Sequence, residues 1–85
     1  MVILILAMLA CGGSSELSEA ELAFSAGADP YDQGLYEEAI SHYEKAIQID
    51  PDYANAYSWR GAAYSMLGQH QTAIADFTKA IQLDP

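Results

Sequence analysis

Apolar and small residues recur every three or four positions along most of the chain, which is the spacing of one face of an α-helix. This pattern predicts four helices, at about residues 18–29, 36–49, 53–67 and 70–83. The short links between consecutive helices predict two antiparallel helical hairpins. The clearest apolar faces contain Tyr57, Gly61, Tyr64 and Leu67 in the third helix and Ala73, Ile74, Phe77, Ala80 and Ile81 in the fourth.

The residues at the helix ends support these boundaries. Ser18 and Glu21 are spaced as a capping box for the first helix, in which each side chain bonds the backbone N–H of the other residue. Asp52 is placed to cap the third helix, and Gly68 is placed to end it. An Asp-Pro pair follows both the second and the fourth helix and ends them, because a residue before proline disfavours helical geometry.

The chain repeats itself with an offset of 34 residues. Residues 18–51 align with residues 52–85, and eight of the sixteen aligned positions from Tyr36 onward are identical. In the weaker first halves Gly27 still aligns with Gly61. Self-similarity at this period marks units that stack side by side, because one hairpin cannot bury its apolar face alone.

Each repeat resembles the tetratricopeptide repeat, whose pattern is W-x2-L-G-x2-Y, then A-x3-F, then P. The second repeat supplies, at the matching positions, Tyr57, Arg60, Gly61, Tyr64, Ala73, Phe77, Ala80 and Pro85. The first repeat supplies Gly27, Gly34, Ala39, Tyr43, Ala46 and Pro51. In the second repeat Tyr57 replaces the Trp and Arg60 replaces the Leu. The resemblance covers residues 18–85 and implies an all-α fold of two stacked helix-turn-helix hairpins, a short right-handed α-solenoid.

The first repeat departs from the motif at Pro30, where the family has an aromatic residue. A proline inside a helix loses a hydrogen bond and clashes with the carbonyl four residues before it, at a cost of about 3 kcal/mol or more. We therefore expect the first helix to kink or stop near Asp29. Tyr31 is the aromatic residue expected to take the vacant place.

Two repeats form a short stack, since about three are usually needed for stability. A third repeat or a capping helix would begin after Pro85, so the outer face of the last helix, with Ile74 and Ile81, is expected to be bare. The sequence leaves three consequences open: a fragment of a longer protein, self-association through the end faces, or marginal stability.

Charge and composition exclude several functions. Twelve Asp and Glu against three Lys and Arg give a formal net charge of -9, which leaves too few cations to neutralise the phosphates of a nucleic acid. The single cysteine excludes an internal disulfide and a multi-cysteine metal cluster. His42 and His70 share no face, so we expect no metal site, which needs three or four ligands. The sequence contains no catalytic constellation and predicts neither an enzyme nor a cofactor.

The first fifteen residues form a separate, uncharged segment. Met1–Ala10 is an unbroken apolar run, too short to span a bilayer, which needs about 20 apolar residues. Cys11 follows the small Ala10 and precedes a Gly-Gly-Ser-Ser stretch. This arrangement resembles a bacterial lipoprotein signal peptide at residues 1–10, with lipidation of Cys11 and a tether at 11–17. The usual basic residues before the apolar run are missing, so a start further upstream, or a leader with a buried free thiol, stays open.

The resemblance to the repeat family also implies a binding groove, because the first helix of each repeat lines a concave surface that holds a peptide or a partner helix. The matching positions are Glu21, Phe24, Ala28, Tyr31, Asp32, Asn55, Ser58, Trp59, Ala62, Ser65 and Met66. Some family members clamp a peptide's terminal carboxylate with Lys and Asn on these helices, whereas the matching positions here hold Phe24, Ala28 and Trp59 and none of them is a lysine. Acidic Glu21 and Asp32 favour a partner with basic or neutral contacts.

Trp59 is the strongest candidate for contact with a partner, since tryptophan is enriched among interface hot spots. The alternative role is packing between the helices.

Two functional hypotheses follow. In the first, the repeats are a scaffold tethered to the membrane through Cys11 in a bacterial cell envelope, facing the periplasm or the exterior, where they help assemble a protein complex. In the second, they are the leading repeats of a larger protein whose effector lies beyond Pro85, or a self-associating adaptor in the cytoplasm.

Overall fold

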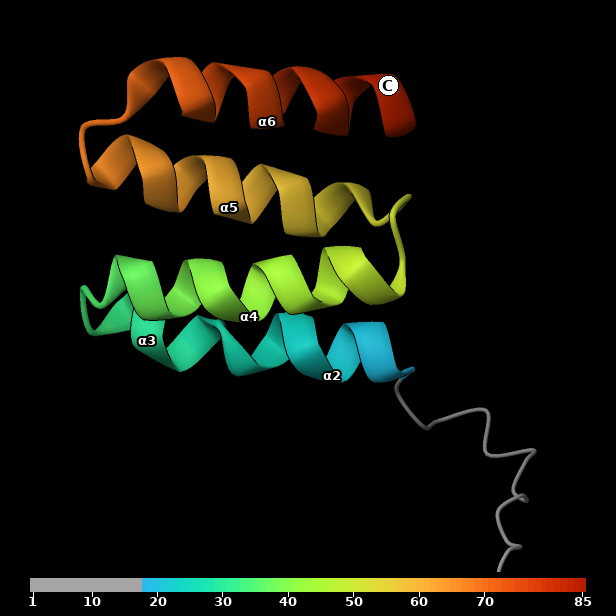
Figure 1. Cartoon of the computed structure of the whole chain (residues 1–85), viewed down its shortest axis with the longest axis horizontal. Coiled ribbons are helices and arrows are strands. Elements are labelled where there is room, and N and C mark those ends of the chain that lie inside the picture. Colours follow the sequence, from blue (N-terminus) through green and yellow to red (C-terminus); the bar gives the residue numbers. More distant parts are fainter. Residues whose placement is uncertain (1–17) are drawn as a thin grey trace, which may run out of the picture.

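The computed structural model describes residues 18–85, which form a row of helices without a strand. In chain order these are α2 (Glu19–Ala26), α3 (Ala28–Asp32), α4 (Tyr36–Ile49), α5 (Ala54–Met66) and α6 (His70–Leu83). They stack in layers in the order of the chain, with α2 and α3 together in the first layer and α6 in the last (Figure 1). The all-α architecture of two stacked hairpins that the sequence predicts is confirmed. The predicted leader, the tether and Cys11 lie outside the described residues.

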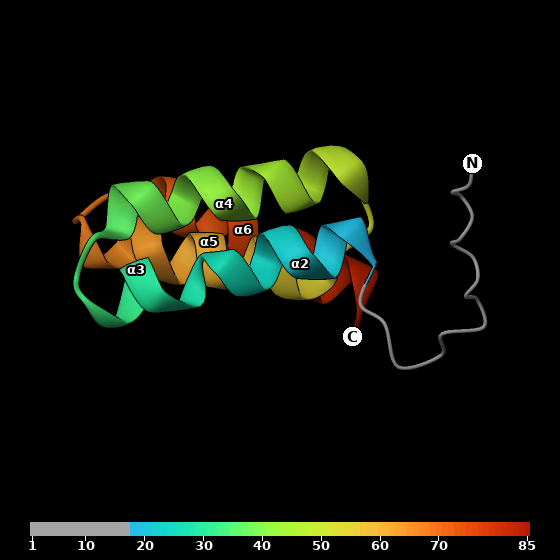
Figure 2. The ribbon, with the colours of Figure 1, turned by 90° about the horizontal axis from the view of Figure 1, so that it is seen from below.

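The first helix is interrupted at Gly27, two residues before the predicted position at Asp29 (Figure 2). This break places Pro30 third in α3, in the first turn, where a backbone N–H has no partner within the helix anyway. The Tyr31 N–H then donates to the Gly27 carbonyl at 3.0 Å and begins the new helix. The proline therefore removes no hydrogen bond from the interior of a helix, because the helix restarts just ahead of it.

The place of the missing aromatic residue is filled by Pro30 itself, which is buried, and not by Tyr31 as expected. Pro30 aligns with Tyr64 of the second repeat. The Tyr31 ring lies instead against the rings of Tyr36 and Trp59, with centroid distances of 5.2 Å to each.

The core consists mainly of small side chains, which let the helices approach closely. Its apolar members are Ala20, Ala39, Ile40, Tyr43, Ala46, Ala56, Ala63 and Ala73. Tyr43, the largest of them, is 2% exposed, and its ring lies against Gly27. A Cβ atom at Gly27 would lie 2.5 Å from Tyr43 Cε1, and one at Gly61 would lie 3.0 Å from Phe77 Cε1. Both aligned glycines therefore stand where the two helices of a hairpin come too close for a side chain.

Most of the predicted helix ends are confirmed. The Ser18 hydroxyl accepts from the Glu21 N–H at 3.1 Å, and the Glu21 carboxylate accepts from the Ser18 N–H at 2.9 Å. Gly68 follows α5 with a φ of +84°, in the left-handed region that favours glycine. The prediction that Asp52 caps α5 is wrong, because the turn places it one residue ahead of the N-cap, Tyr53.

The turn between the repeats is ordered by a different aspartate. The carboxylate of Asp50 accepts from the Asp52 N–H at 3.1 Å, and the Tyr53 N–H donates to the Asp50 carbonyl at 3.1 Å. The Tyr57 hydroxyl adds a bond of 3.0 Å to the Pro51 carbonyl. These bonds join the end of α4 to the start of α5 and fix how the second hairpin follows the first.

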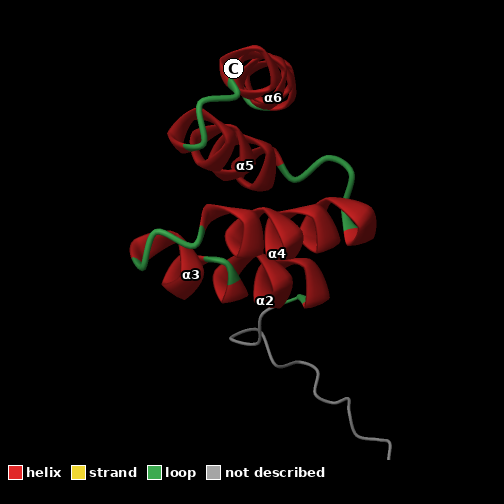
Figure 3. Cartoon of the chain, turned by 60° about the vertical axis from the view of Figure 1, so that its left-hand side comes forward, coloured by secondary structure: helices red, strands yellow, loops and turns green. Residues whose placement is uncertain are grey.

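Among residues 18–85, α6 is the last helix of the row and no other helix lies beyond it (Figure 3). Ile74 and Ile81 on this helix are 62% and 64% exposed, as the repeat pattern predicts. Within residues 18–85, no helix combines the length and the apolar character needed to cross a membrane.

Candidate functional site

Five of the predicted groove residues meet around one hollow of about 180 Å³, which we call the aromatic pocket. Its lining residues are Phe24, Ala28, Tyr31, Asp32, Tyr43 and Trp59. They come from α2, α3, α4 and α5, so both repeats contribute to it. Sequence reasoning missed Tyr43, because its position lies on the second helix of the repeat and outside the groove that the family resemblance implies.

The rings of the aromatic pocket meet at angles and do not stack. Tyr31 and Trp59 are perpendicular, at 90° with a centroid distance of 5.2 Å. Phe24 and Tyr43 are tilted by 39° at 5.6 Å. Aromatic pairs of this kind contribute about 0.5–1.5 kcal/mol each beyond the burial of their surface. The contact between Tyr31 and Trp59 joins α3 of the first repeat to α5 of the second.

Trp59 is 44% exposed although it touches Tyr31, so it is not a buried packing residue between helices. An exposed tryptophan held in place by one edge contact keeps much of its surface available to a partner. Trp59 lies where the two repeats meet, so part of its ring packs against Tyr31 while the rest stays at the surface.

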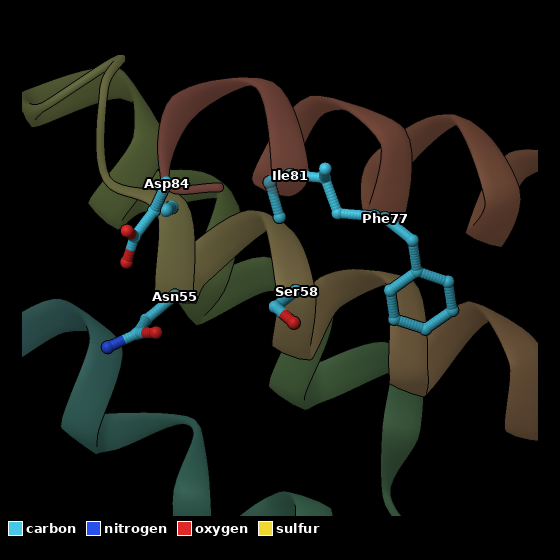
Figure 4. A pocket seen from close by; sticks show the side chains of 7 residues that line it. Asn55, Ser58, Phe77, Ile81 and Asp84 are labelled. Carbon is cyan, nitrogen blue, oxygen red and sulfur yellow. The ribbon is translucent and has the colours of Figure 1, made fainter.

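The other predicted groove residues do not join the aromatic pocket. Asn55 and Ser58 line a second hollow of about 340 Å³ between α5 and α6, the end pocket. Its remaining lining residues are Ala54, Phe77, Ala80, Ile81 and Asp84, and the Phe77 ring extends from α6 beside α5 (Figure 4). Ser58 and Trp59 face different hollows because successive residues of a helix point about 100° apart.

Glu21, Ala62, Ser65 and Met66 line neither hollow. The Glu21 carboxylate is engaged in the capping box, and Met66 is 58% exposed near the end of α5. Of the eleven predicted groove residues, five thus line the aromatic pocket, two line the end pocket and four line neither.

Asp32 is the charged residue of the aromatic pocket, and it is exposed. The pocket lining includes neither lysine nor arginine. Lys45 on α4 and Lys79 on α6 are exposed elsewhere, and Arg60 is bonded to Asp76. The terminal carboxylate of a peptide placed here would meet aromatic rings and a negative charge.

The ion pair between Arg60 and Asp76 was not anticipated from the sequence. Arg60 donates from Nε to Asp76 Oδ2 and from Nη2 to Oδ1, both at 2.8 Å, and the side chains are 21% and 7% exposed. The guanidinium also lies 5.6 Å from the ring centroid of Tyr57 and 6.0 Å from that of Tyr64. The hydrogen bonds that Arg60 donates to Asp76 raise the pKa of Arg60, and burial opposes this shift.

The pair connects α5 to α6 at a position where the family has leucine. The sequence did contain a sign of this ion pair, because Arg60 stands on an otherwise apolar helix face. Such an arginine indicates an acidic partner nearby, but the sequence does not identify that partner.

Two tyrosines have raised pKa values. Burial raises the pKa of Tyr43, and repulsion from an ionised Tyr31 and from the Asp32 carboxylate raises it further. Burial also raises the pKa of Tyr53, with smaller contributions from Glu21 and Asp50. Tyr43 and Asp32 both line the aromatic pocket.

The side chains of residues 18–85 can be considered for metal binding and for contact with a partner. Within residues 18–85, no three His, Cys, Asp or Glu side chains gather closely enough to hold a metal ion. In the same range, every buried polar side-chain atom has a hydrogen-bond partner. The surface of the aromatic pocket is almost entirely apolar, with four aromatic residues and Asp32 as its one charged member, which suits the binding of a side chain.

Comparisons with known proteins agree with the repeated architecture. A family model described as "TPR repeat" matches residues 29–68, and one described as "Tetratricopeptide repeat" matches residues 54–85. The chain is also 45% identical over 42 residues to a Triticum aestivum protein named "Hsp70-Hsp90 organizing protein". That match covers 49% of this chain and 7% of the Triticum aestivum protein.

Proposed function

This chain is built from tetratricopeptide repeats, and on that premise we propose that it is a protein–protein interaction module and not an enzyme. The observation that carries the proposal is the aromatic pocket, which both repeats line and in which Trp59 is 44% exposed. Small-molecule sites enclose roughly 300–1,000 Å³. A hollow of about 180 Å³ is better matched to one side chain of a partner protein.

Peptide selection tests this function. We would select binders to the full chain from a random peptide library and measure their dissociation constants by calorimetry. Trp59→Ala is expected to weaken binding by about 30-fold or more, because truncating a hot-spot residue costs about 2 kcal/mol or more. Leu22→Ala is the matched control, since Leu22 is also an exposed apolar side chain and lies outside both hollows and outside the predicted groove. Equal loss in both variants, or none in either, would exclude the aromatic pocket as the binding site.

The proposed partner is not recognised through its terminal carboxylate. The Triticum aestivum relative is named for two chaperones, but the match covers only a small part of it. The positions that form a carboxylate clamp in some family members hold Phe24, Ala28 and Trp59 here. Amidation of a bound peptide's carboxyl terminus is therefore expected to leave its affinity unchanged, and a large loss would contradict this point.

We further propose that the module is tethered to a membrane of the bacterial cell envelope through a lipid on Cys11, facing the periplasm or the exterior. The support is the sequence of an apolar run, a small residue, the cysteine and a small polar tether. Each buried methylene of an acyl chain contributes about 0.8 kcal/mol, and two chains make a stable anchor. A chain with a net charge of -9 gains no attraction from anionic lipids, so a lipid would have to supply the anchor.

The intact mass of the protein made in a bacterial host tests the tether. We expect a mature species that begins at Cys11 and carries acyl mass, and we expect the Cys11→Ala variant to lose it. An unmodified chain that retains Met1 would exclude the tether and favour an adaptor in the cytoplasm.

The bare face of α6 favours a second candidate, in which the chain self-associates or is covered by further repeats of a longer protein. The observation is the exposure of Ile74 and Ile81. Light scattering over a concentration series tests self-association, which Ile81→Glu is expected to abolish. A monomer at every concentration would exclude it.

A further inference from the structure

The chemistry of the aromatic pocket leads to a specific occupant, and this inference rests on the proposed function. We propose that the pocket binds a cationic side chain, lysine or arginine, of the partner protein. Four aromatic residues from four helices line the hollow together with Asp32, which is exposed at the surface.

The rings offer surfaces that attract a cation. A positive group is drawn to the face of an aromatic ring, most strongly to tryptophan, by the negative charge of its π electrons. Tyr31 and Trp59 are perpendicular, so the edge of one ring meets the face of the other. The ring that contributes its edge has neither of its faces covered by that contact. Phe24 and Tyr43 are also tilted and not stacked. Neither of these two ring pairs is therefore stacked face to face, and all four rings belong to residues that line the hollow.

The charge of the pocket selects among possible side chains. The exposed Asp32 carboxylate would repel an acidic side chain of the partner. An apolar side chain would leave this carboxylate without a counter-charge, whereas a cationic side chain pairs with it. The negative field of Asp32 already contributes to the raised pKa of Tyr43. The chain's own cations do not line the pocket, since Arg60 is held by Asp76 and the two lysines are exposed on α4 and α6.

The size and the overall charge agree with this occupant. A volume of about 180 Å³ suits a single long side chain. Lysine and arginine place an apolar stem along ring surfaces and keep the charged head near a carboxylate or water. The net charge of -9 also attracts a basic segment over a distance and speeds its association.

The test uses the peptides selected without bias against the full chain. In each binder, every lysine and arginine is replaced in turn by norleucine, which keeps an apolar stem and removes the charge. We expect one replacement to raise the dissociation constant by about tenfold or more, with a change in the fluorescence of Trp59, the chain's one tryptophan.

Two variants of the protein locate the effect. Asp32→Asn is expected to weaken the original peptide several-fold and to leave the norleucine peptide unchanged. Asp52→Asn removes an equal charge from the exposed turn between α4 and α5 and is expected to affect neither. The comparison thus separates the local carboxylate from the general acidity of the chain.

Equal affinity for the lysine and norleucine peptides, with Trp59→Ala still weakening both, would overturn the cationic occupant and leave the proposed function standing. If no peptide binds, the proposed function fails, and the pocket is then tested directly with tetramethylammonium and with tert-butanol, a neutral molecule of similar size. We expect the cation alone to shift the indole N–H signal of Trp59 in nuclear magnetic resonance spectra. Equal shifts from both probes, or none, would overturn the inference.

Discussion

Replacing Arg60 by alanine is expected to destabilise the protein by about 2–4 kcal/mol. The guanidinium makes two hydrogen bonds of 2.8 Å to Asp76, whose side chain is 7% exposed, so the variant would leave a buried carboxylate without its counter-charge. Breaking a fully buried pair costs about 3–5 kcal/mol, whereas an exposed pair contributes about 0–1 kcal/mol. The Arg60 side chain is 21% exposed, so the expected cost of breaking this pair is lower than that of a fully buried pair. The lost contacts with the rings of Tyr57 and Tyr64 add to the cost.

Thermal unfolding followed by far-ultraviolet circular dichroism measures this loss. A small domain loses about 4–8 °C of melting temperature per kcal/mol, so the midpoint is expected to fall by roughly 10–30 °C. The double variant of Arg60→Ala and Asp76→Ala completes a thermodynamic cycle. If the unpaired carboxylate carries the cost, the double variant is more stable than Arg60→Ala alone.

The matched control is Lys45→Ala, which removes an exposed cation from α4 and is expected to change stability by at most about 0.5 kcal/mol. A loss below about 1 kcal/mol for Arg60→Ala would refute the reasoning, since it would place the pair among exposed ones. Strict additivity of the two single variants would refute it as well, because it would mean that the side chains do not interact.

Three further predictions concern the first repeat and the tyrosines. Gly27→Ala is expected to cost about 1–3 kcal/mol in thermal unfolding, because the added Cβ would lie 2.5 Å from the enclosed Tyr43 ring, and full stability would contradict that contact. Ser18→Ala removes the capping box and is expected to cost about 0.5–2 kcal/mol, detected as faster amide exchange in α2. The pKa values of Tyr43 and Tyr53 are raised above 10.0, so their contribution to stability is complete below that pH and is lost as the pH rises through the folded values. Tyr43→Phe should reduce this alkaline loss, and an ultraviolet titration in which no tyrosine ionises late would count against it.

The helices were predictable because their signals are local. The predicted ranges 36–49 and 70–83 are the observed bounds of α4 and α6. A periodic apolar face and a glycine that favours the left-handed region after the helix act within a few residues, so the sequence records them directly. The stacking of the two hairpins followed from the repeat, since identical units bury identical faces against one another.

The break in the first helix shows how local reasoning places a feature approximately. Pro30 indicated an interruption, but the sequence could not tell where the chain would bend. The structure resolves the choice at Gly27, where the ring of Tyr43 from α4 leaves no room for a side chain. The aligned Gly61 is also crowded by a ring but lies within the unbroken α5, so the close contact alone does not cause the interruption.

The sequence by itself determined the helices, the hairpins and the acidic surface, because periodicity, turn residues and charge are properties of short segments and of composition. Tertiary structure decided which side chains meet. Arg60 on α5 pairs with Asp76 on α6. Tyr43 on α4 lines the aromatic pocket beside rings from α2, α3 and α5. A helical pattern shows which residues share a face, but the partner of that face depends on how the helices cross. That crossing is set by close packing of small residues along the whole interface, which no single segment encodes.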